Sequence, residues 1–244
     1  MRAVLAFVAM LVAGPSAAVE CRDTSHDGNR YTICEVDAAQ EDLRLFLNGD
    51  DGRPLGQFGA VNRVLADEGK QLAFAMNAGM YHDDRSPVGH YVENGQEVMR
   101  VIPGAGPGNF GLLPNGVFCI SEGRAEVIET QAYLARDPGC THATQSGPML
   151  VIDGALHPRF LPDSTSRYVR NGVGTSADGT RAVFALSRGP VTFHAFARLF
   201  RDHLKLPQAL YFDGNISRLY APGLGRNDPG FDLGPIVGVA EPAE

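Results

Sequence analysis

The chain has 244 residues, 44% of them hydrophobic, which is enough for one sizeable globular domain or two small ones. Its formal net charge is −7 at pH 7, from 28 acidic and 21 basic residues. Such a surface lacks the basic face that DNA, RNA or an anionic membrane requires, so we expect no nucleic acid among its partners.

The first residues have the pattern of a secretory signal. Arg2 supplies a positive end, residues 3–14 form an apolar stretch that is short for a membrane span, and small residues at 16–18 offer a cleavage site. We therefore expect residues 1–18 to be a signal peptide and residues 19–244 to form one exported domain. That domain would be periplasmic or secreted, with no stable membrane anchor.

The rest of the chain alternates short apolar runs with turn residues, as in a sheet-rich fold. Strands are predicted at 31–37, 43–48, 71–77, 88–95, 116–121, 125–130, 147–154, 169–176, 182–187, 209–213 and 234–240. The first two strands would form a hairpin. Helices are predicted at 59–69 and 192–204, and the second, with Thr192 as its N-cap, should pack across the sheet. The predicted fold class is α+β: a single strand-rich domain with a mixed sheet and few helices.

The four cysteines fall into two local pairs, Cys21 with Cys34 and Cys119 with Cys140. Four cysteines allow three pairings, and we expect the two local ones, because an exported chain meets oxidising conditions. A zinc site is the alternative, but the sequence contains no C-x-x-C spacing. Two disulfides are therefore predicted.

Polar side chains and glycines gather at four predicted strand ends, where a rigid sheet often holds binding loops. They are Asn77 and Gly79, Ser146 and Gly147, Arg170 and Asn171, and finally Asp213 with Gly214, Asn215 and Ser217. Each group alone also fits a plain turn or strand entrance, and Arg170 alone fits a surface ion pair.

The run His82-Asp83-Asp84 could bind a metal, for which calcium fits best because oxygen ligands dominate. Adjacent side chains in an irregular loop rarely converge on one ion, so we expect no metal and no other cofactor.

Taken in order, the four strand-end segments resemble the phosphodiester glycosidase family over roughly residues 70–240. Asn77-Ala-Gly-Met is similar to the family's Asn-Gly-Gly-Phe-like turn, and Gln145-Ser-Gly-Pro-Met-Leu-Val to its second segment. Arg170-Asn-Gly-Val-Gly is similar to Arg-x-x-x-Gly, and Phe212-Asp-Gly-Asn-Ile-Ser to Leu-Asp-Gly-Gly-Gly-Ser. Two glycines of the last motif are replaced, so the chain resembles a bacterial branch of the family that is often linked to exopolysaccharides.

The resemblance implies an exported glycosidase that cleaves a sugar-1-phosphodiester or a related glycan linkage. Asp213 would place its carboxylate near the sugar C1 atom, and the Arg170 guanidinium would hold the departing phosphate. The other strand-end residues would bind sugar hydroxyls or phosphate oxygens. Because the chain has no Trp, Tyr81, Tyr91 or Tyr168 would have to stack on the sugar.

The alternative is a non-catalytic glycan-binding or exopolysaccharide-assembly protein on the same scaffold. Asn215 and Ile216 stand where the family has glycines, and side chains there let the backbone approach a ligand less closely.

Overall fold

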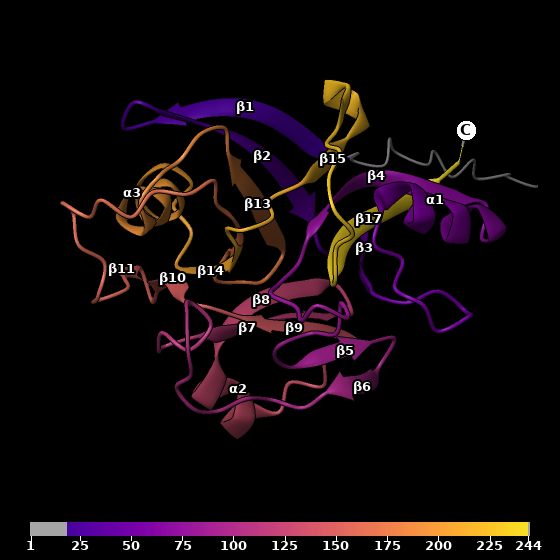
Figure 1. Ribbon diagram of the computed structural model, residues 1–244, viewed down its shortest axis with the longest axis horizontal. Coiled ribbons are helices and arrows are strands. Elements are labelled where there is room, and N and C mark those ends of the chain that lie inside the picture. The colour runs from indigo at the N-terminus through magenta and orange to yellow at the C-terminus, as the bar shows by residue number, and fades with distance from the viewer. Residues whose placement is uncertain (1–18, 244) are drawn as a thin grey trace, which may run out of the picture.

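The computed structural model describes residues 19–243, so the predicted signal peptide lies outside the described residues. The strands form three sheets (Figure 1). The first sheet contains, from edge to edge, β1 (Glu20–His26), β2 (Asn29–Asp37), β13 (Arg181–Ser187), β12 (Asn171–Thr175), β14 (Gln208–Asp213), β10 (Met149–Ile152) and β11 (Ala155–Leu156).

The other two sheets have five strands each. The second contains β16 (Arg226–Asn227), β15 (Leu219–Ala221), β4 (Lys70–Asn77), β17 (Ile236–Pro242) and β3 (Asp42–Phe46). The third contains β6 (Gln96–Met99), β5 (Tyr91–Glu93), β9 (His142–Ser146), β7 (Gly116–Ser121) and β8 (Arg124–Glu129).

All strand pairs within residues 19–243 are antiparallel, so the prediction of a mixed sheet is wrong. Parallel neighbours need long crossover connections, which are usually helical. Here tight hairpins join β1 to β2, β5 to β6, β7 to β8 and β12 to β13. The strand-rich character with few helices agrees with the sequence-based expectation.

The predicted hairpin between the strands at 31–37 and 43–48 is also wrong. β2 pairs with β1 on one side and with β13 on the other, so both of its edges are occupied. β3 belongs to the second sheet, where it pairs with β17. The turn between β2 and β3 therefore carries the chain from one sheet to another.

One hydrophobic core lies between the three sheets. Phe184 and Phe212 enter it from the first sheet, Phe74 from the second and Phe118 from the third, and all four are buried. The Phe184 ring lies 4.9 Å from that of Phe74 and 5.7 Å from that of Phe118. These contacts between distant segments hold the sheets against one another.

Helices cover the outer faces of the sheets (Figure 1). In α1 (Phe58–Asp67), Phe58, Val61 and Leu65 are buried at helical spacing against the second sheet. Helix α2 (Thr130–Arg136) follows β8. Helix α3 (Phe193–Arg198) continues as the π-helical turn η1 (Leu199–His203), and a short 3₁₀ turn, η2 (Pro222–Leu224), follows β15.

Helix α3 begins and packs as predicted. The Thr192 hydroxyl accepts the backbone N–H of Ala195 at 3.1 Å and so caps the first turn. Phe196 and Phe200 are buried against the face of the first sheet that lies away from the central core. The helix thereby returns the chain to the sheet just before β14.

Both predicted disulfides are present. Cys21–Cys34 joins directly opposed positions of β1 and β2, and Cys119–Cys140 joins β7 to the segment before β9. Among residues 19–243, the helices are all too short or too polar to cross a bilayer.

Candidate active site

The candidate site is built on the end of β14. Leu210 and Phe212 are buried in the central core, as their apolar run predicts. Successive side chains of a strand point to opposite faces, so Tyr211 and Asp213 lie on the other side, where both line one cavity. β14 therefore delivers a phenol and a carboxylate to the same place.

Asp213 is 8% exposed, and its carboxyl is held by the turn that follows it. Its Oδ1 atom accepts the backbone N–H groups of Gly214 at 2.6 Å and of Asn215 at 2.9 Å. Burial raises the pKa of Asp213 above its ordinary value, while these hydrogen bonds to the carboxylate oppose the rise. The result is a fixed, largely buried carboxyl group in the cavity wall.

Arg170 lies immediately before β12 and is only 1% exposed. Its guanidinium carbon lies 3.5 Å from the centre of the Phe193 ring, a cation–π contact. Nε donates to the carbonyl of Val191 at 2.9 Å and Nη2 to that of Ser166 at 3.3 Å. Burial lowers the pKa of Arg170 because it disfavours the charged form.

The remaining nitrogen of this guanidinium, Nη1, is buried and has no hydrogen-bond partner within residues 19–243. Over the same residues, Arg170 forms no ion pair with a carboxylate. A buried cation with a free donor is unusual, because burying a charge is unfavourable unless the charge is paired. Arg170 also lines the cavity that contains Asp213, so an anion bound there would balance the charge of the guanidinium.

The cavity that contains both groups has a volume of about 770 Å³. Its wall includes Arg170, Tyr211, Asp213, Gly214 and Asn215, and loops at 80–88 and 107–110 complete it.

Asn77, Ser146 and Asn171 meet at the same strand end, although they come from different sheets. They are fully buried and do not line the cavity. Ser146 Oγ donates to the Phe212 carbonyl at 2.8 Å, and Asn77 Nδ2 donates to the Ile216 carbonyl at 2.9 Å. These polar side chains thus bond to the protein itself, on either side of Asp213.

Asn171 completes this network. Its Nδ2 atom donates to Ser217 Oγ at 2.8 Å and to Asn77 Oδ1 at 3.3 Å, and Asn77 Oδ1 also accepts the Arg218 backbone N–H at 3.1 Å. Side chains from β4, β9 and β12 therefore hold the chain from Phe212 to Arg218.

The two remaining glycines of the predicted site also lie outside the cavity wall. A side chain at Gly79 would press on Thr144 Oγ1 at 3.0 Å, and one at Gly147 on the side chain of Asn115 at 2.7 Å. Close packing accounts for glycine at position 147, and at position 79 a φ of 149°, which side chains disfavour, adds to the close packing.

Of the three tyrosines considered for sugar stacking, Tyr81 and Tyr168 line the cavity. Tyr168 is half exposed, and its ring centre lies 5.5 Å from the Arg170 guanidinium carbon. Tyr91 is fully buried in the central core, so of the three alternatives only Tyr81 and Tyr168 remain for stacking on a sugar.

The His82–Asp84 run does not gather around one point. Asp84 Oδ1 accepts the backbone N–H and the hydroxyl of Ser86, and so closes the turn. Residues 19–243 contain no group of three His, Cys, Asp or Glu side chains arranged to hold a metal ion.

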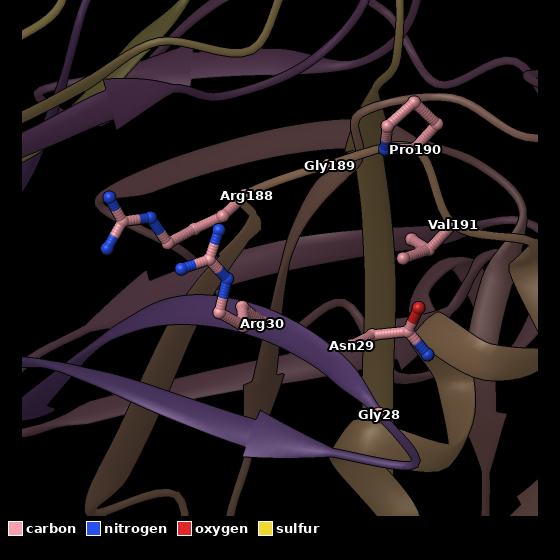
Figure 2. Close-up of a pocket in the computed structure, with 7 residues that line it drawn as sticks. All are labelled: Gly28, Asn29, Arg30, Arg188, Gly189, Pro190 and Val191. Carbon is pink, nitrogen blue, oxygen red and sulfur yellow. The ribbon is translucent and has the colours of Figure 1, made fainter.

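A smaller hollow of about 200 Å³ lies between the β1–β2 turn and the segment after β13 (Figure 2). Figure 2 shows the side chains of Arg30 and Arg188 extending beside each other, and the backbone N–H of Arg188 donates to the Arg30 carbonyl at 2.9 Å. Arg188 pairs with Asp23. The residues lining this hollow include no acid, so the larger cavity is the better candidate for chemistry.

Sequence reasoning missed two residues at the site, Tyr211 and Phe193. Tyr211 precedes Asp213 by two positions, and this strand spacing was the available signal. Phe193 was assigned to the apolar face of its helix, whereas its ring stacks on Arg170. Only the fold brings the two together.

Fold and cavity together define a strand-rich domain that holds an acid and a cation at one buried site. The family model for phosphodiester glycosidases matches residues 70–239. The chain therefore belongs to the phosphodiester glycosidase family.

One relative is the uncharacterized protein YigE of Escherichia coli (strain K12). It is 34% identical over 188 residues, which cover 77% of this chain and 73% of YigE.

Two solved structures share the fold. The first is the catalytic domain of zebrafish N-acetylglucosamine-1-phosphodiester alpha-N-acetylglucosaminidase, auto-inhibited by its pro-peptide. It matches with a TM-score of 0.62 and 12% identity over 94% of this chain and 85% of that one. A hypothetical protein from Synechocystis matches with a TM-score of 0.60 and 12% identity over 91% of this chain and 61% of that one.

Proposed function

We propose that this protein is an exported glycosidase that cleaves a sugar-1-phosphodiester or a related glycan linkage. One observation carries the proposal: the buried Arg170 guanidinium, which forms no ion pair within residues 19–243, lines the same cavity as the buried Asp213 carboxyl. Such a cation favours an anionic ligand, and such a carboxylate favours a positive centre. A sugar phosphodiester in its transition state carries both charges.

The chemistry divides between these two groups. When the bond between C1 and the phosphate oxygen breaks, its electron pair goes to the phosphate, and C1 becomes oxocarbenium-like. The Asp213 carboxylate would stabilise C1, and Arg170 would bind the phosphate as its charge grows. Water then adds to C1 and loses a proton, which gives the free sugar and a phosphate monoester. Phosphate leaves readily as an anion, so a strong general acid is less needed.

Export is part of the proposal. Two disulfides in one chain are typical of proteins that fold in an oxidising compartment, such as the bacterial periplasm or the medium. We infer that the mature protein acts there on a glycan or sugar phosphodiester.

An assay on a sugar-1-phosphodiester, with and without chelator, tests the activity. We expect release of the free sugar at a rate that chelator does not change. Tight binding without turnover would favour the non-catalytic glycan-binding alternative. Chelator-sensitive cleavage on the phosphate side would favour a metal-dependent phosphodiesterase instead.

A further inference from the structure

Tyr211 is a polar residue of the cavity wall to which the proposed function assigns no role. It lies on the same face of β14 as Asp213, and its ring packs edge-on against Phe193 at 4.8 Å. The Arg170 guanidinium carbon lies 5.4 Å from its ring centre. Tyr211 is therefore fixed between the cation and the carboxyl group of the site.

Gly214 makes room for the Tyr211 hydroxyl. Its backbone is not in the left-handed conformation that favours glycine, so the turn itself does not require a glycine there. A Cβ atom at position 214 would instead collide with the Tyr211 hydroxyl oxygen. The glycine after Asp213 thus accommodates a phenol from the strand.

The Tyr211 hydroxyl stays protonated and can donate. Burial raises the pKa of Tyr211 well above its ordinary value, and the Asp213 charge raises it further, while Arg170 opposes the rise. A protonated phenol offers one O–H donor without adding a charge.

We propose that the Tyr211 hydroxyl is a phosphate-binding group of this site, donating to the same phosphodiester that the Arg170 guanidinium binds. The inference rests on the proposed function for the identity of this anion. A phosphodiester has two non-bridging oxygens that share one negative charge. One cation and one neutral donor match that pattern, so the structure assigns the site to a singly charged diester.

Binding of dimethyl phosphate, a phosphodiester with no sugar to cleave, tests this inference without turnover. Tyr211→Phe removes the hydroxyl and keeps the ring. We expect the dissociation constant of this variant for dimethyl phosphate, measured by NMR titration, to be about tenfold higher or more than that of the wild type. A loss of this size corresponds to one hydrogen bond to a charged group. Tyr220→Phe, the same change on β15 outside the cavity wall, should bind like the wild type.

A second pair of variants tests the position of the hydroxyl. Gly214→Ala should destabilise the wild-type protein, and the loss should be smaller in the Tyr211→Phe background, because the clashing oxygen is gone. Urea unfolding of the four proteins measures this difference. Equal losses in both backgrounds would overturn the inference.

Failure of the inference can be told apart from failure of the proposed function. Wild-type binding of dimethyl phosphate that Tyr211→Phe does not weaken overturns the role of Tyr211, as does the absence of wild-type binding. Hydroxyl-dependent binding without release of sugar from any sugar-1-phosphodiester supports Tyr211 and contradicts the glycosidase.

Discussion

Asp213 combines a strand-end position with burial, and its raised pKa affects both activity and stability. Asp213→Asn keeps an oxygen that can accept the Gly214 and Asn215 amides but removes the negative charge. We expect turnover to fall at least about a hundredfold, in line with losing a charged catalytic group. Initial rates on a sugar-1-phosphodiester measure this change.

The pH dependence of stability gives an independent measure of the same residue. The folded pKa of Asp213 lies above its unfolded value, so the stability held by the protonated form is lost as pH rises through the folded value. Asn cannot ionise. The stability of Asp213→Asn relative to the wild type should therefore increase with pH, which urea unfolding at several pH values would show.

Asp153→Asn is the matched control, because Asp153 directly follows β10 and precedes a glycine, just as Asp213 ends β14 and precedes one, but Asp153 is exposed. It should leave turnover unchanged. Near-normal sugar release by Asp213→Asn would contradict a catalytic role for Asp213 and would leave it as a turn residue.

Arg170 should not be replaceable by lysine. The guanidinium donates to two carbonyls while it lines the cavity, whereas an ammonium group is a single point of charge. Arg170→Lys should raise KM at least tenfold for a sugar-1-phosphodiester. Arg167→Lys, on the exposed loop three residues earlier, should not change KM. Unchanged KM in Arg170→Lys would argue that the cavity does not bind an anion through this residue.

At the scale of elements, the end of β14 depends on strands from the other two sheets. Ser146 on β9 bonds to the Phe212 carbonyl, next to Asp213. Ser146→Ala should cost about 1 kcal/mol of stability, the typical net value of one hydrogen bond. Turnover should fall with KM little changed, because Ser146 acts on the position of Asp213 and does not line the cavity.

Ser25→Ala, on the exposed face of β1, is the control for Ser146→Ala. It should change neither turnover nor the free energy of unfolding. Steady-state kinetics and urea unfolding report both effects. A Ser146→Ala variant that loses substrate affinity instead of turnover would show that the hydroxyl contacts the ligand directly.

At the scale of the whole molecule, Glu93 links the third sheet to the second. Its side chain accepts the Tyr91 hydroxyl at 3.1 Å, the backbone of Leu47 favours its charged form, and burial raises its pKa from 4.5 to about 7. Because the folded pKa exceeds the unfolded one, the stability that this carboxyl contributes is full below pH 4.5 and is lost as pH rises through about 7.

Glu93→Gln keeps the acceptor oxygen but cannot ionise. We expect its stability relative to the wild type to rise between pH 4.5 and 8. Burial lowers the pKa of His142 to about 4, which makes the stability of every variant increase with pH. Comparing each variant with the wild type cancels this contribution. Exposed Glu122→Gln should follow the wild type at every pH, and the same flat result for Glu93→Gln would contradict the assignment.

The sequence by itself determined features that depend on neighbours along the chain. Local spacing predicted both disulfides, the apolar run up to Phe212, the Thr192 cap and the buried face of α3. The strand-end residues also identified the family, because its motifs are short and continuous.

Only the tertiary structure decided which strands pair and what the polar residues contact. β9 was not predicted, because its buried sequence, HATQS, is polar. Such side chains can be buried only where distant segments provide their hydrogen-bond partners. For the same reason Asn77, Ser146 and Asn171 were expected in the cavity but bond to the protein around Asp213. Apolar periodicity depends on nearby residues, whereas pairing and polar satisfaction depend on residues far along the chain.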